Sequence, residues 1–201
     1  MMEYEYDYQP DDPYCYPGTK VLINKLNITD PEQFYNAERR ITALRLSTMP
    51  EQFMRGRFGL THLCAIHRHI FGDVYDWAGE VRKGEFLAKG NTIFCLGRHI
   101  DNYSDSIFSS LADENRLKRL DKNKFIERLA FYMGEVNALH PFRDGNGRTA
   151  REFFRLLSQN AGYDLDIGSV DKDALLSADI AAFNRQYQPL IDVLNSIIHK
   201  I

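Results

Sequence analysis

The chain of 201 residues is long enough for a single domain with a sizeable core, and its 44% hydrophobic and 26% charged residues are typical of a globular protein. A net charge of -3 excludes the broad basic surface of a general nucleic-acid binder, so we expect no direct nucleic-acid partner. Cys15, Cys64 and Cys95 form no CxxC pair, which argues against a zinc site or a disulfide framework and for a reducing compartment. The sequence has no leader-like start and no apolar run of membrane-spanning length, so we expect a cytoplasmic protein without a membrane partner.

The first eighteen residues, MMEYEYDYQPDDPYCYPG, are acidic and rich in tyrosine. Pro10, Pro13 and Pro17 make a long helix unfavourable there, so we expect residues 1–18 to form an extended arm whose tyrosines pack on the domain. A regulatory tyrosine segment is the alternative. Residues 19–201 then form the domain itself.

Helical patterns begin near residue 29. Thr29 or Asp30 is a suitable N-cap, and Pro31 fits the first helical position. The next apolar residues at helical spacing predict a helix that ends before Gly72; they are Leu60, Leu63, Ile66, Ile70 and Phe71.

The stretch EVRKGEFLAKGNTIFC, residues 80–95, interrupts this spacing and predicts a small β-hairpin that turns near Lys89 and Asn91. Helical spacing then returns and leads into His140, and a further helix follows with Gly162 as its expected C-cap. The tail, residues 171–201, is expected to add one or two helices. The predicted fold class is all-α: a mostly helical single domain with one small β-hairpin.

The segment HPFRDGNGRTAR, residues 140–151, concentrates chemistry at a helix–loop–helix junction. Gly145, Asn146 and Gly147 allow backbone conformations in which successive N–H groups converge on one anion, and the following helix presents its N-terminus to the same point. Arg148 and Arg151 are three residues apart and share a helix face, which suits a polyphosphate better than a single carboxylate.

Two further residues of the segment add catalytic chemistry. Asp144 can hold Mg²⁺, which typically takes one or two carboxylates and completes its shell with phosphate oxygens and water. His140 is the nearby group whose pKa suits proton transfer near neutral pH. Taken singly, Gly-Asn-Gly is most often a turn and one arginine most often a surface charge, so only the joint spacing predicts a phosphate-handling site.

The joint spacing resembles the signature of the Fic (filamentation induced by cAMP) domain family, HPFx(D/E)GNGRxxR, and matches it at every specified position. The stretches LTHLCAIHRHIFGDVYDWAGEVR and KGNTIF also resemble the upstream helix and the flap hairpin of that family. The resemblance covers residues 12 to 195, with a catalytic core over about residues 55–165 and a flap over about residues 81–95. The segment DPYCYPGTKVLINKLNI resembles the N-terminal stretch of the bacterial toxin-type members.

The resemblance implies transfer of AMP from ATP to a Tyr, Ser or Thr hydroxyl of another protein. His140 would be the general base, and Asp144 would bind Mg²⁺ between the α- and β-phosphates. Gly145, Asn146 and Gly147 would cradle the phosphates, and Asn146 would help to orient the transferred one. The two arginines would hold the leaving pyrophosphate and the γ-phosphate; they are Arg148 and Arg151, respectively.

The resemblance also implies that the flap holds an extended segment of the target by main-chain hydrogen bonds and covers the nucleotide. The flap residues expected at the nucleotide are Lys89, Gly90, Asn91 and Thr92. Asn184 and Tyr187 lie where relatives place contacts to the adenine. An ordinary structural hairpin is the alternative interpretation of this segment.

Glycine at position 147 favours AMP transfer, because relatives that transfer phosphate carry lysine there. Three alternatives remain at this stage: an idle nucleotide-binding or interaction protein, a Fic variant that uses another phosphate-containing donor, and a nuclease toxin. An intact His140 argues against the first, because binding alone needs no base. The negative charge and the single acidic residue of the motif argue against the nuclease.

Fic enzymes are commonly restrained by a helix with the pattern (S/T)xxxE(G/N), whose glutamate pairs with the second motif arginine. STMPEQ, residues 47–52, ends in Gln and contains a proline, and SLADEN, residues 110–115, fits the letters but lies within the core. We interpret both as chance matches and expect a separate small antitoxin to supply the inhibitory helix. The chain would then be the toxin of a two-protein module, and a DNA gyrase or related type II topoisomerase subunit is the implied target.

Overall fold

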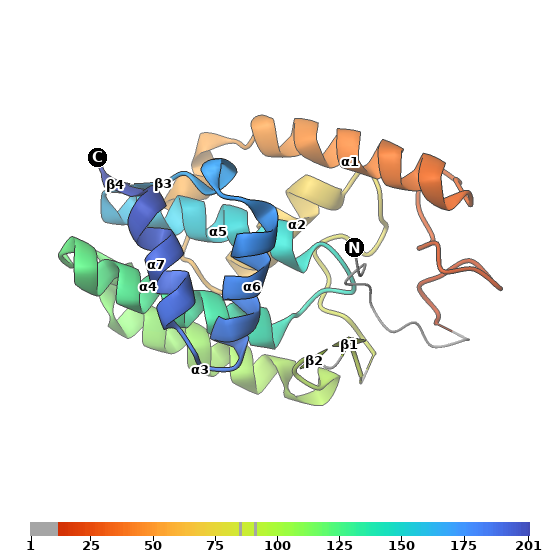
Figure 1. Cartoon of the computed structure of the whole chain (residues 1–201). Coiled ribbons are helices and arrows are strands. Elements are labelled where there is room, and N and C mark those ends of the chain that lie inside the picture. Colours follow the sequence, from red (N-terminus) through yellow and green to blue (C-terminus); the bar gives the residue numbers. More distant parts are fainter. Residues whose placement is uncertain (1–11, 85, 91) are drawn as a thin grey trace.

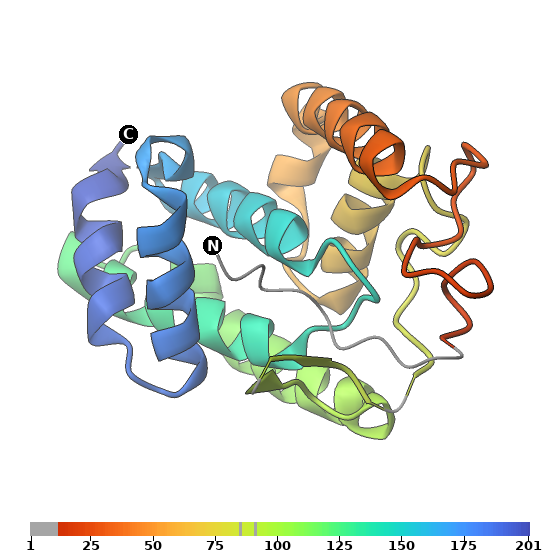
Figure 2. The same ribbon diagram turned by 45° about the vertical axis from the view of Figure 1, so that its right-hand side comes forward.

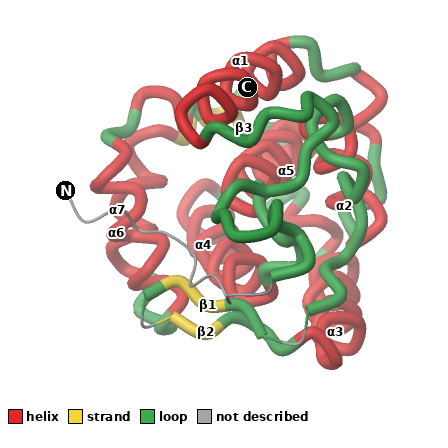
Figure 3. Tube along the Cα trace, turned by 90° about the vertical axis from the view of Figure 1, so that its right-hand side faces the viewer, coloured by secondary structure: helices red, strands yellow, loops and turns green. Residues whose placement is uncertain are grey.

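The computed structural model of the protein describes residues 12–84, 86–90 and 92–201. This described part contains seven α-helices: α1 (Pro31–Ser47), α2 (Leu60–Phe71), α3 (Ile100–Asp113), α4 (Lys122–Leu139), α5 (Asn146–Ala161), α6 (Lys172–Phe183) and α7 (Gln188–Ile197). Short 3₁₀ turns span Glu51–Arg55, Gly97–His99, Asn115–Leu117 and Ile167–Ser169. None of the helices in these ranges is both long and apolar enough to cross a membrane. The predicted mostly helical class is confirmed (Figure 3).

Side-chain caps and glycine determine where the helices begin and end. The Asp30 carboxylate accepts a hydrogen bond from the N–H of Gln33 at 2.8 Å, which starts α1 at the expected place. Asp121 caps α4 in the same way through the N–H of Lys124 at 3.0 Å. Gly162, with φ of +92°, is the C-cap of α5, as its sequence position predicts.

The core lies where α2, α4 and α5 meet. Ile66, Leu129 and Phe153, one from each of these helices, are completely buried. α1 packs across α2 on one side (Figure 1), and α6 and α7 lie side by side against α4 on the other (Figure 2). The loop between α4 and α5, which carries the motif, is therefore held by helices that the core fixes.

Two short pairs of antiparallel strands lie in different parts of the molecule (Figure 1). β1 (Ala88–Lys89) pairs with β2 (Thr92–Ile93), which confirms the predicted hairpin, called the flap from here on. β3 (Tyr163–Leu165) follows α5 directly and pairs with β4 (Ile198–Lys200) near the C-terminus. The sequence pattern does not predict this second pairing, because three-residue strands are too short to show alternation.

The described end of the predicted arm, residues 12–18, lies against the domain. Cys15 pairs with Leu22 in an isolated β-bridge, and both side chains belong to the core. Tyr14 contacts Trp77 edge-on, with ring centroids 5.7 Å apart. Residues 1–11 of the predicted arm fall outside the described residues.

Candidate active site

His140 lies where α4 ends and the motif loop begins. Its backbone has φ of 45° and ψ of 59°, a left-handed conformation that is uncommon for such a side chain. Pro141 favours the departure from the helix, because a residue before proline avoids the right-handed helical region. Sequence and strain together place the imidazole at the junction.

The neutral ring of His140 has one tautomer that satisfies its neighbours. Nδ1 lies 3.1 Å from the carbonyl oxygen of Asn137 and must donate, since a carbonyl only accepts. Nε2 then holds the lone pair that can accept a proton. Burial lowers the pKa of His140 to about 3, the Asn137 carbonyl opposes this, and nearby positive charges lower it further. The ring stacks on Phe94 with centroids 3.5 Å apart, so it is both neutral and held in place.

The loop that follows is braced from within. The Asn146 side chain accepts a hydrogen bond from the N–H of Phe142 at 2.9 Å and donates to its carbonyl oxygen at 2.8 Å. Gly145 has φ of +77°, and a Cβ there would lie 2.4 Å from the Phe71 ring. Only glycine avoids both the strain and the clash. The resemblance assigns Asn146 to phosphate orientation; in this structure its amide shapes the loop.

The motif helix α5 begins at Asn146, inside the motif, so its first N–H groups belong to the site. Gly145, the residue before it, has no side chain that could cap them. Free N–H groups and the positive end of a 16-residue helix make this point a favourable place for an anion.

The two motif arginines have different surroundings. The Nη2 of Arg148 lies 2.6 Å from Oε1 of Glu38 on α1. Arg151 forms no hydrogen bond or ion pair within the described ranges of the chain. Burial lowers the pKa of Arg151, the Asp179 charge opposes this, and the Arg148 charge adds to it. One arginine is therefore held by the protein, and the other is available to an incoming anion.

A cavity of about 290 Å³ collects most of the predicted site residues. The predicted residues that line it are Lys89, Thr92, His140, Asp144, Gly145, Asn146, Gly147, Arg148 and Arg151. A larger hollow of about 930 Å³ adjoins it beside α1 and shares Asp144 and the two motif arginines with it. The motif thus lies between two open spaces, as a site that receives an extended polyphosphate requires.

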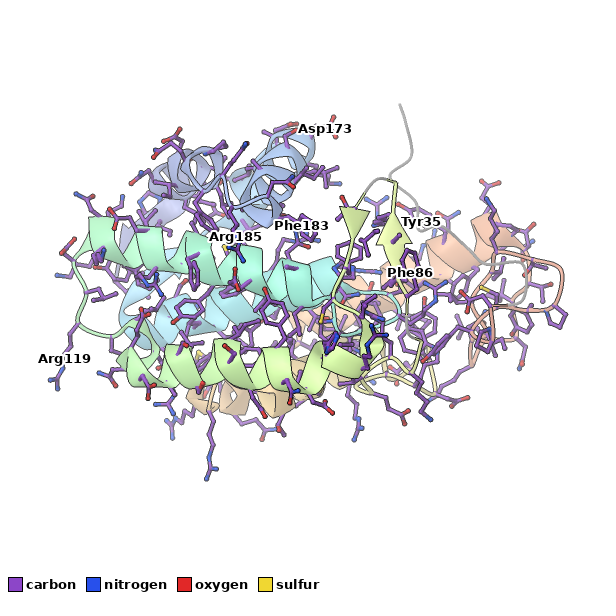
Figure 4. All side chains as sticks on the ribbon, turned by 90° about the horizontal axis from the view of Figure 1, so that it is seen from below. Tyr35, Phe86, Arg119, Asp173, Phe183 and Arg185 are labelled. Carbon is purple, nitrogen blue, oxygen red and sulfur yellow. The ribbon has the colours of Figure 1, made fainter. Side chains whose placement is uncertain are left out.

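The flap closes one side of the cavity. Lys89 and Thr92 line it, Gly90 takes φ of +53° in the turn outside the lining, and Asn91 lies outside the described residues. Burial lowers the pKa of Lys89, and the Asp144 charge opposes this. Phe94, just after β2, meets Phe183 of α6 with ring centroids 5.9 Å apart. Phe183 lies on the side of α6 toward the flap (Figure 4).

Arg82 connects the flap to the motif. Its Nε donates to the carbonyl oxygen of His140 at 3.1 Å, and its backbone N–H donates to that of Pro141 at 2.8 Å. Nη1 donates to the carbonyl oxygen of Gly84 at 2.8 Å, and Nη2 donates to that of Cys95. One buried guanidinium therefore ties both ends of the flap segment to the residue that carries the base.

Asp144 supplies the carboxylate expected for Mg²⁺. No three His, Cys, Asp or Glu side chains gather into a metal site among the described residues. Asp144 nevertheless lines the cavity beside the N-terminus of α5, where a phosphate would lie. A single carboxylate suits Mg²⁺ that shares its shell with phosphate oxygens and water. The donor set fits a magnesium ion that arrives with a nucleotide.

His67 on α2 holds the motif loop from behind. Its Nδ1 accepts a hydrogen bond from the N–H of Gly79 at 2.8 Å, so Nε2 carries the proton and donates to the carbonyl oxygen of Asp144 at 3.0 Å. The ring stacks on Phe142 with centroids 4.0 Å apart. Burial lowers the pKa of His67 to about 4, with a smaller opposing contribution from its hydrogen bond to the backbone of Asp144. Its sequence position, on the buried face of a helix just before the Trp-Ala-Gly-Glu stretch, is the signal that could have identified it.

The wall opposite the motif comes from α6, a helix whose sequence predicts no role in the site. Leu176, Asp179, Ile180 and Phe183 line the cavity at a spacing that places them on one helix face. Burial raises the pKa of Asp179 to about 6, and Arg151 opposes this. The three apolar side chains suit a flat apolar group such as a nucleobase.

The two residues expected at the adenine do not line this cavity. Asn184 is the C-cap of α6, and its side chain donates to the carbonyl oxygen of Ile180 at 2.9 Å. Tyr187 packs against Phe131 with ring centroids 5.8 Å apart. Both lie just beyond the end of α6, whereas the cavity is lined by the face of that helix.

The chain matches known proteins along most of its length. The model of the Fic/DOC family matches residues 57–158, which include the whole motif. The probable protein adenylyltransferase Fic of Escherichia coli is 40% identical over 164 residues, which cover 81% of this chain and 80% of that protein.

The chain belongs to the Fic/DOC family.

The resemblance found in the motif is therefore confirmed, and other relatives agree with it. The protein adenylyltransferase VbhT of Bartonella schoenbuchensis is 40% identical over 173 residues, 86% of this Fic chain, which spans only 36% of VbhT. Among solved structures, BepC of Bartonella tribocorum with bound AMPPNP superposes with a TM-score of 0.88 at 26% identity, covering 96% of this chain and 100% of BepC. A Fic domain of Bartonella quintana with bound ADP has the same TM-score.

Proposed function

We propose that the protein is an adenylyltransferase that transfers AMP from ATP to a Tyr, Ser or Thr hydroxyl of a target protein. The observation that carries this proposal is a neutral His140, with Nε2 able to accept a proton, in one cavity with a helix N-terminus and two arginines. The names of the relatives and the AMPPNP bound to BepC support the same activity.

In this mechanism the hydroxyl oxygen attacks the α-phosphorus, a new P–O bond forms, and the bond to pyrophosphate breaks. The hydroxyl proton passes to Nε2 of His140. Because burial lowers the pKa of His140, the ring is neutral before the substrate arrives and Nε2 can accept the proton. A bound triphosphate brings negative charge that raises this pKa and strengthens the base.

The phosphate side of the reaction rests on positioning and charge. The first N–H groups of α5 receive the transferred phosphate, and Arg148 and Arg151 neutralise charge that develops on the leaving pyrophosphate. Asp144 would hold Mg²⁺, which lowers the charge repulsion among the phosphates. Gly147 has no side chain at the N-terminus of α5. The nearest atom to a Cβ placed there would be Nη1 of Arg151, at 3.2 Å.

Incubation with α-labelled and γ-labelled ATP in a lysate tests the reaction directly. We expect label from the α-phosphate, and none from the γ-phosphate, to appear on a protein when Mg²⁺ is present. Transfer of the γ-label alone would indicate a kinase-like reaction and would overturn the assignment. Nucleotide binding without transfer of either label would favour the alternative of an idle binding protein.

The flap is the proposed docking site for the target. β1 and β2 form a two-stranded sheet, and an extended segment of a target can add to such a sheet through main-chain hydrogen bonds. Such pairing demands little of the target sequence. Many different target segments could therefore dock and place a Tyr, Ser or Thr hydroxyl near His140. A type II topoisomerase subunit such as that of DNA gyrase is the first target to test.

We further propose that the protein is the toxin of a cytoplasmic two-protein module whose small antitoxin supplies the inhibitory (S/T)xxxE(G/N) helix. Within the described ranges, Arg151 has no carboxylate partner at hydrogen-bond distance that could restrain it. Glu114, the acidic residue of SLADEN, is instead engaged elsewhere: it accepts hydrogen bonds from Arg128 at 2.8 Å and from the Tyr132 hydroxyl at 2.9 Å. Because Glu114 is already bound by these two residues, its position supports inhibition by a separate protein and not by SLADEN.

Expression without a partner tests this second proposal. The wild-type chain is expected to be active alone and to slow growth. Glu114→Gly is expected to lower stability, because it leaves Arg128 unpaired, without raising the rate of self-modification. A silent wild type together with an activated, folded Glu114 variant would show that the brake is internal.

A further inference from the structure

Helix α1 contacts the motif at one catalytic arginine. Arg148 Nη1 donates to Oε2 of Glu38 at 2.9 Å and to Oγ1 of Thr42 at 3.1 Å. Its Nη2 forms the 2.6 Å ion pair with the other carboxylate oxygen of Glu38. Both hydrogens of Nη1 are thus used by α1, which leaves Nε and a hydrogen of Nη2 to serve the cavities that Arg148 lines.

The buried face of α1 is unusually polar. Its three buried residues are Phe34, Glu38 and Thr42, spaced four apart. Glu38 is only 6% exposed and Thr42 only 2%. Burying a carboxylate is costly even when it is paired, and a well-packed apolar residue is often the more stable choice. Stability alone therefore does not account for a glutamate at this place.

The guanidinium of Arg148 also packs on the ring of Phe71 from α2. The Cζ atom of Arg148 lies 4.6 Å from the centre of the Phe71 ring, the same ring that Gly145 approaches. Burial lowers the pKa of Arg148, but the hydrogen bond to Glu38 and the negative charges of Glu38 and Asp144 together raise it overall. α1 and α2 thus hold one charged group in one orientation beside the anion site.

We propose that Glu38 and Thr42 are positioning residues that orient Arg148 toward the β-phosphate and the leaving pyrophosphate. The inference rests on the proposed AMP transfer and adds α1, more than a hundred residues away in sequence, to the site. An unanchored arginine loses much rotamer freedom when it binds a phosphate, and the anchor removes that cost in advance. The alternative is that Glu38 competes with the phosphates for Arg148.

The two ideas predict opposite results for Glu38→Gln. If Glu38 positions Arg148, the variant binds ADP about tenfold more weakly, as expected for loss of one charge-assisted contact. AMP has no β-phosphate, so its affinity changes less than twofold. In transfer assays kcat falls more than the KM for ATP rises, because the interaction matters most as pyrophosphate leaves. Tighter ADP binding by the variant would show competition and would overturn the proposal.

Glu152→Gln is the matched control. Glu152 is a buried glutamate with hydrogen bonds from Arg155 at 2.8 and 2.6 Å, on the same helix as Arg148 but outside the cavity lining. We expect it to leave the ratio of ADP to AMP affinity unchanged. A similar change of that ratio in Glu152→Gln would assign the effect to general loosening of α5.

Thr42→Val keeps the test informative if Glu38→Gln fails to fold, as circular dichroism would reveal. It removes one neutral contact and is expected to weaken ADP two- to threefold, again with AMP unchanged. Equal losses for ADP and AMP, or no loss of either in the folded variants, would overturn the proposal. These binding measurements do not depend on transfer, so an inactive wild type would contradict the proposed function without deciding the role of Glu38.

Discussion

The motif loop and the flap form two walls of one cavity, and they are built in opposite ways. Every turn of the loop is held by interior contacts: Asn146 to Phe142, Gly145 against Phe71, and His67 to Asp144. The flap consists of two two-residue strands tied down at its base by Arg82. Phe86, labelled in Figure 4, is 52% exposed, and Ile93 of β2 is 56% exposed.

The difference separates chemistry from recognition. A base and an anion site must hold their relative positions within fractions of an ångström, so the loop is fixed before substrate arrives. A surface that accepts segments of a partner gains from exposed backbone and apolar side chains instead. Variants on the two walls should therefore fail in different ways.

The largest effect is expected for His140→Ala. Loss of the general base should lower kcat by about 10²–10⁴-fold while ATP binding changes less than about threefold, since phosphate contacts come from α5 and the arginines. Single-turnover kinetics and calorimetry on the same preparation measure the two quantities. A collapse of ATP affinity together with activity would mean that His140 is structural.

Gly145→Ala tests the shape of the loop. The new Cβ meets the Phe71 ring and the backbone keeps a positive φ, so we expect the free energy of unfolding to fall by about 2–4 kcal/mol. Nucleotide affinity should fall as well, because the loop carries the anion site. Gly90→Ala in the flap is the control: its φ is also positive but a Cβ meets open space, so we expect a cost of about 1 kcal/mol. Equal losses in the two variants would contradict the contrast between the walls.

His67 makes the stability of the loop depend on pH. Its pKa is about 4 in the folded protein and 6.5 ordinarily, so between these values the unfolded chain binds a proton that the folded one does not. The contribution of neutral His67 to the free energy of unfolding is therefore complete above pH 6.5 and is lost as the pH falls toward 4. His140, with a pKa of about 3, adds to the same trend. His67→Phe keeps the ring but leaves the N–H of Gly79 and the carbonyl of Asp144 unpaired, which should cost about 2 kcal/mol at pH 7. Urea titrations at pH 5 and pH 7 should show a shallower pH dependence than in the wild type; an unchanged slope would exclude His67 as its source.

The smallest change in stability, with a selective change in function, is expected on the flap. Ile93→Ser should leave the free energy of unfolding within about 0.5 kcal/mol and ADP affinity unaltered. Modification of the target should fall about three- to tenfold in kcat/KM, because an exposed apolar contact is lost. Leu44→Ser, at a similarly exposed position of α1, is the control. We expect the Leu44→Ser variant to modify the target at the wild-type rate. If the two substitutions behaved alike, the flap would not be the dock.

The sequence predicts the parts of the molecule that follow local rules. Pro31, Gly162 and the apolar stripe before His140 indicate the correct helices, and the residues of the motif line one cavity because they are neighbours along the chain. The predicted elements do not include α3, although its buried residues have helical spacing. They do not include the pairing of β3 with β4 either, because these strands lie more than thirty residues apart in sequence.

The remainder of the site depends on contacts between distant segments. Glu38 looks like a surface charge until α1 packs across α2 and brings it to Arg148, and Leu176 and Ile180 look like ordinary core residues of α6 until that helix faces the motif. Asn184 and Tyr187 lie beyond the end of α6 and outside the cavity lining, and one helical turn decides whether residues at such loose spacing face the cavity. Tertiary packing supplies this information, and no local pattern contains it.

The pairing of β3 with β4 has a consequence for how α6 can vary. The N–H of Asp166 donates to the carbonyl oxygen of Ile197 at 3.1 Å, and the N–H of Ile201 donates to that of Gly162 at 3.0 Å, so the segment between them leaves and rejoins the framework at one place. The two ends of the segment that carries α6 and α7 are thus joined to each other by β3 and β4. Substitutions on the cavity face of α6 can then change the wall opposite the motif while the strand pairing that joins the two ends is kept.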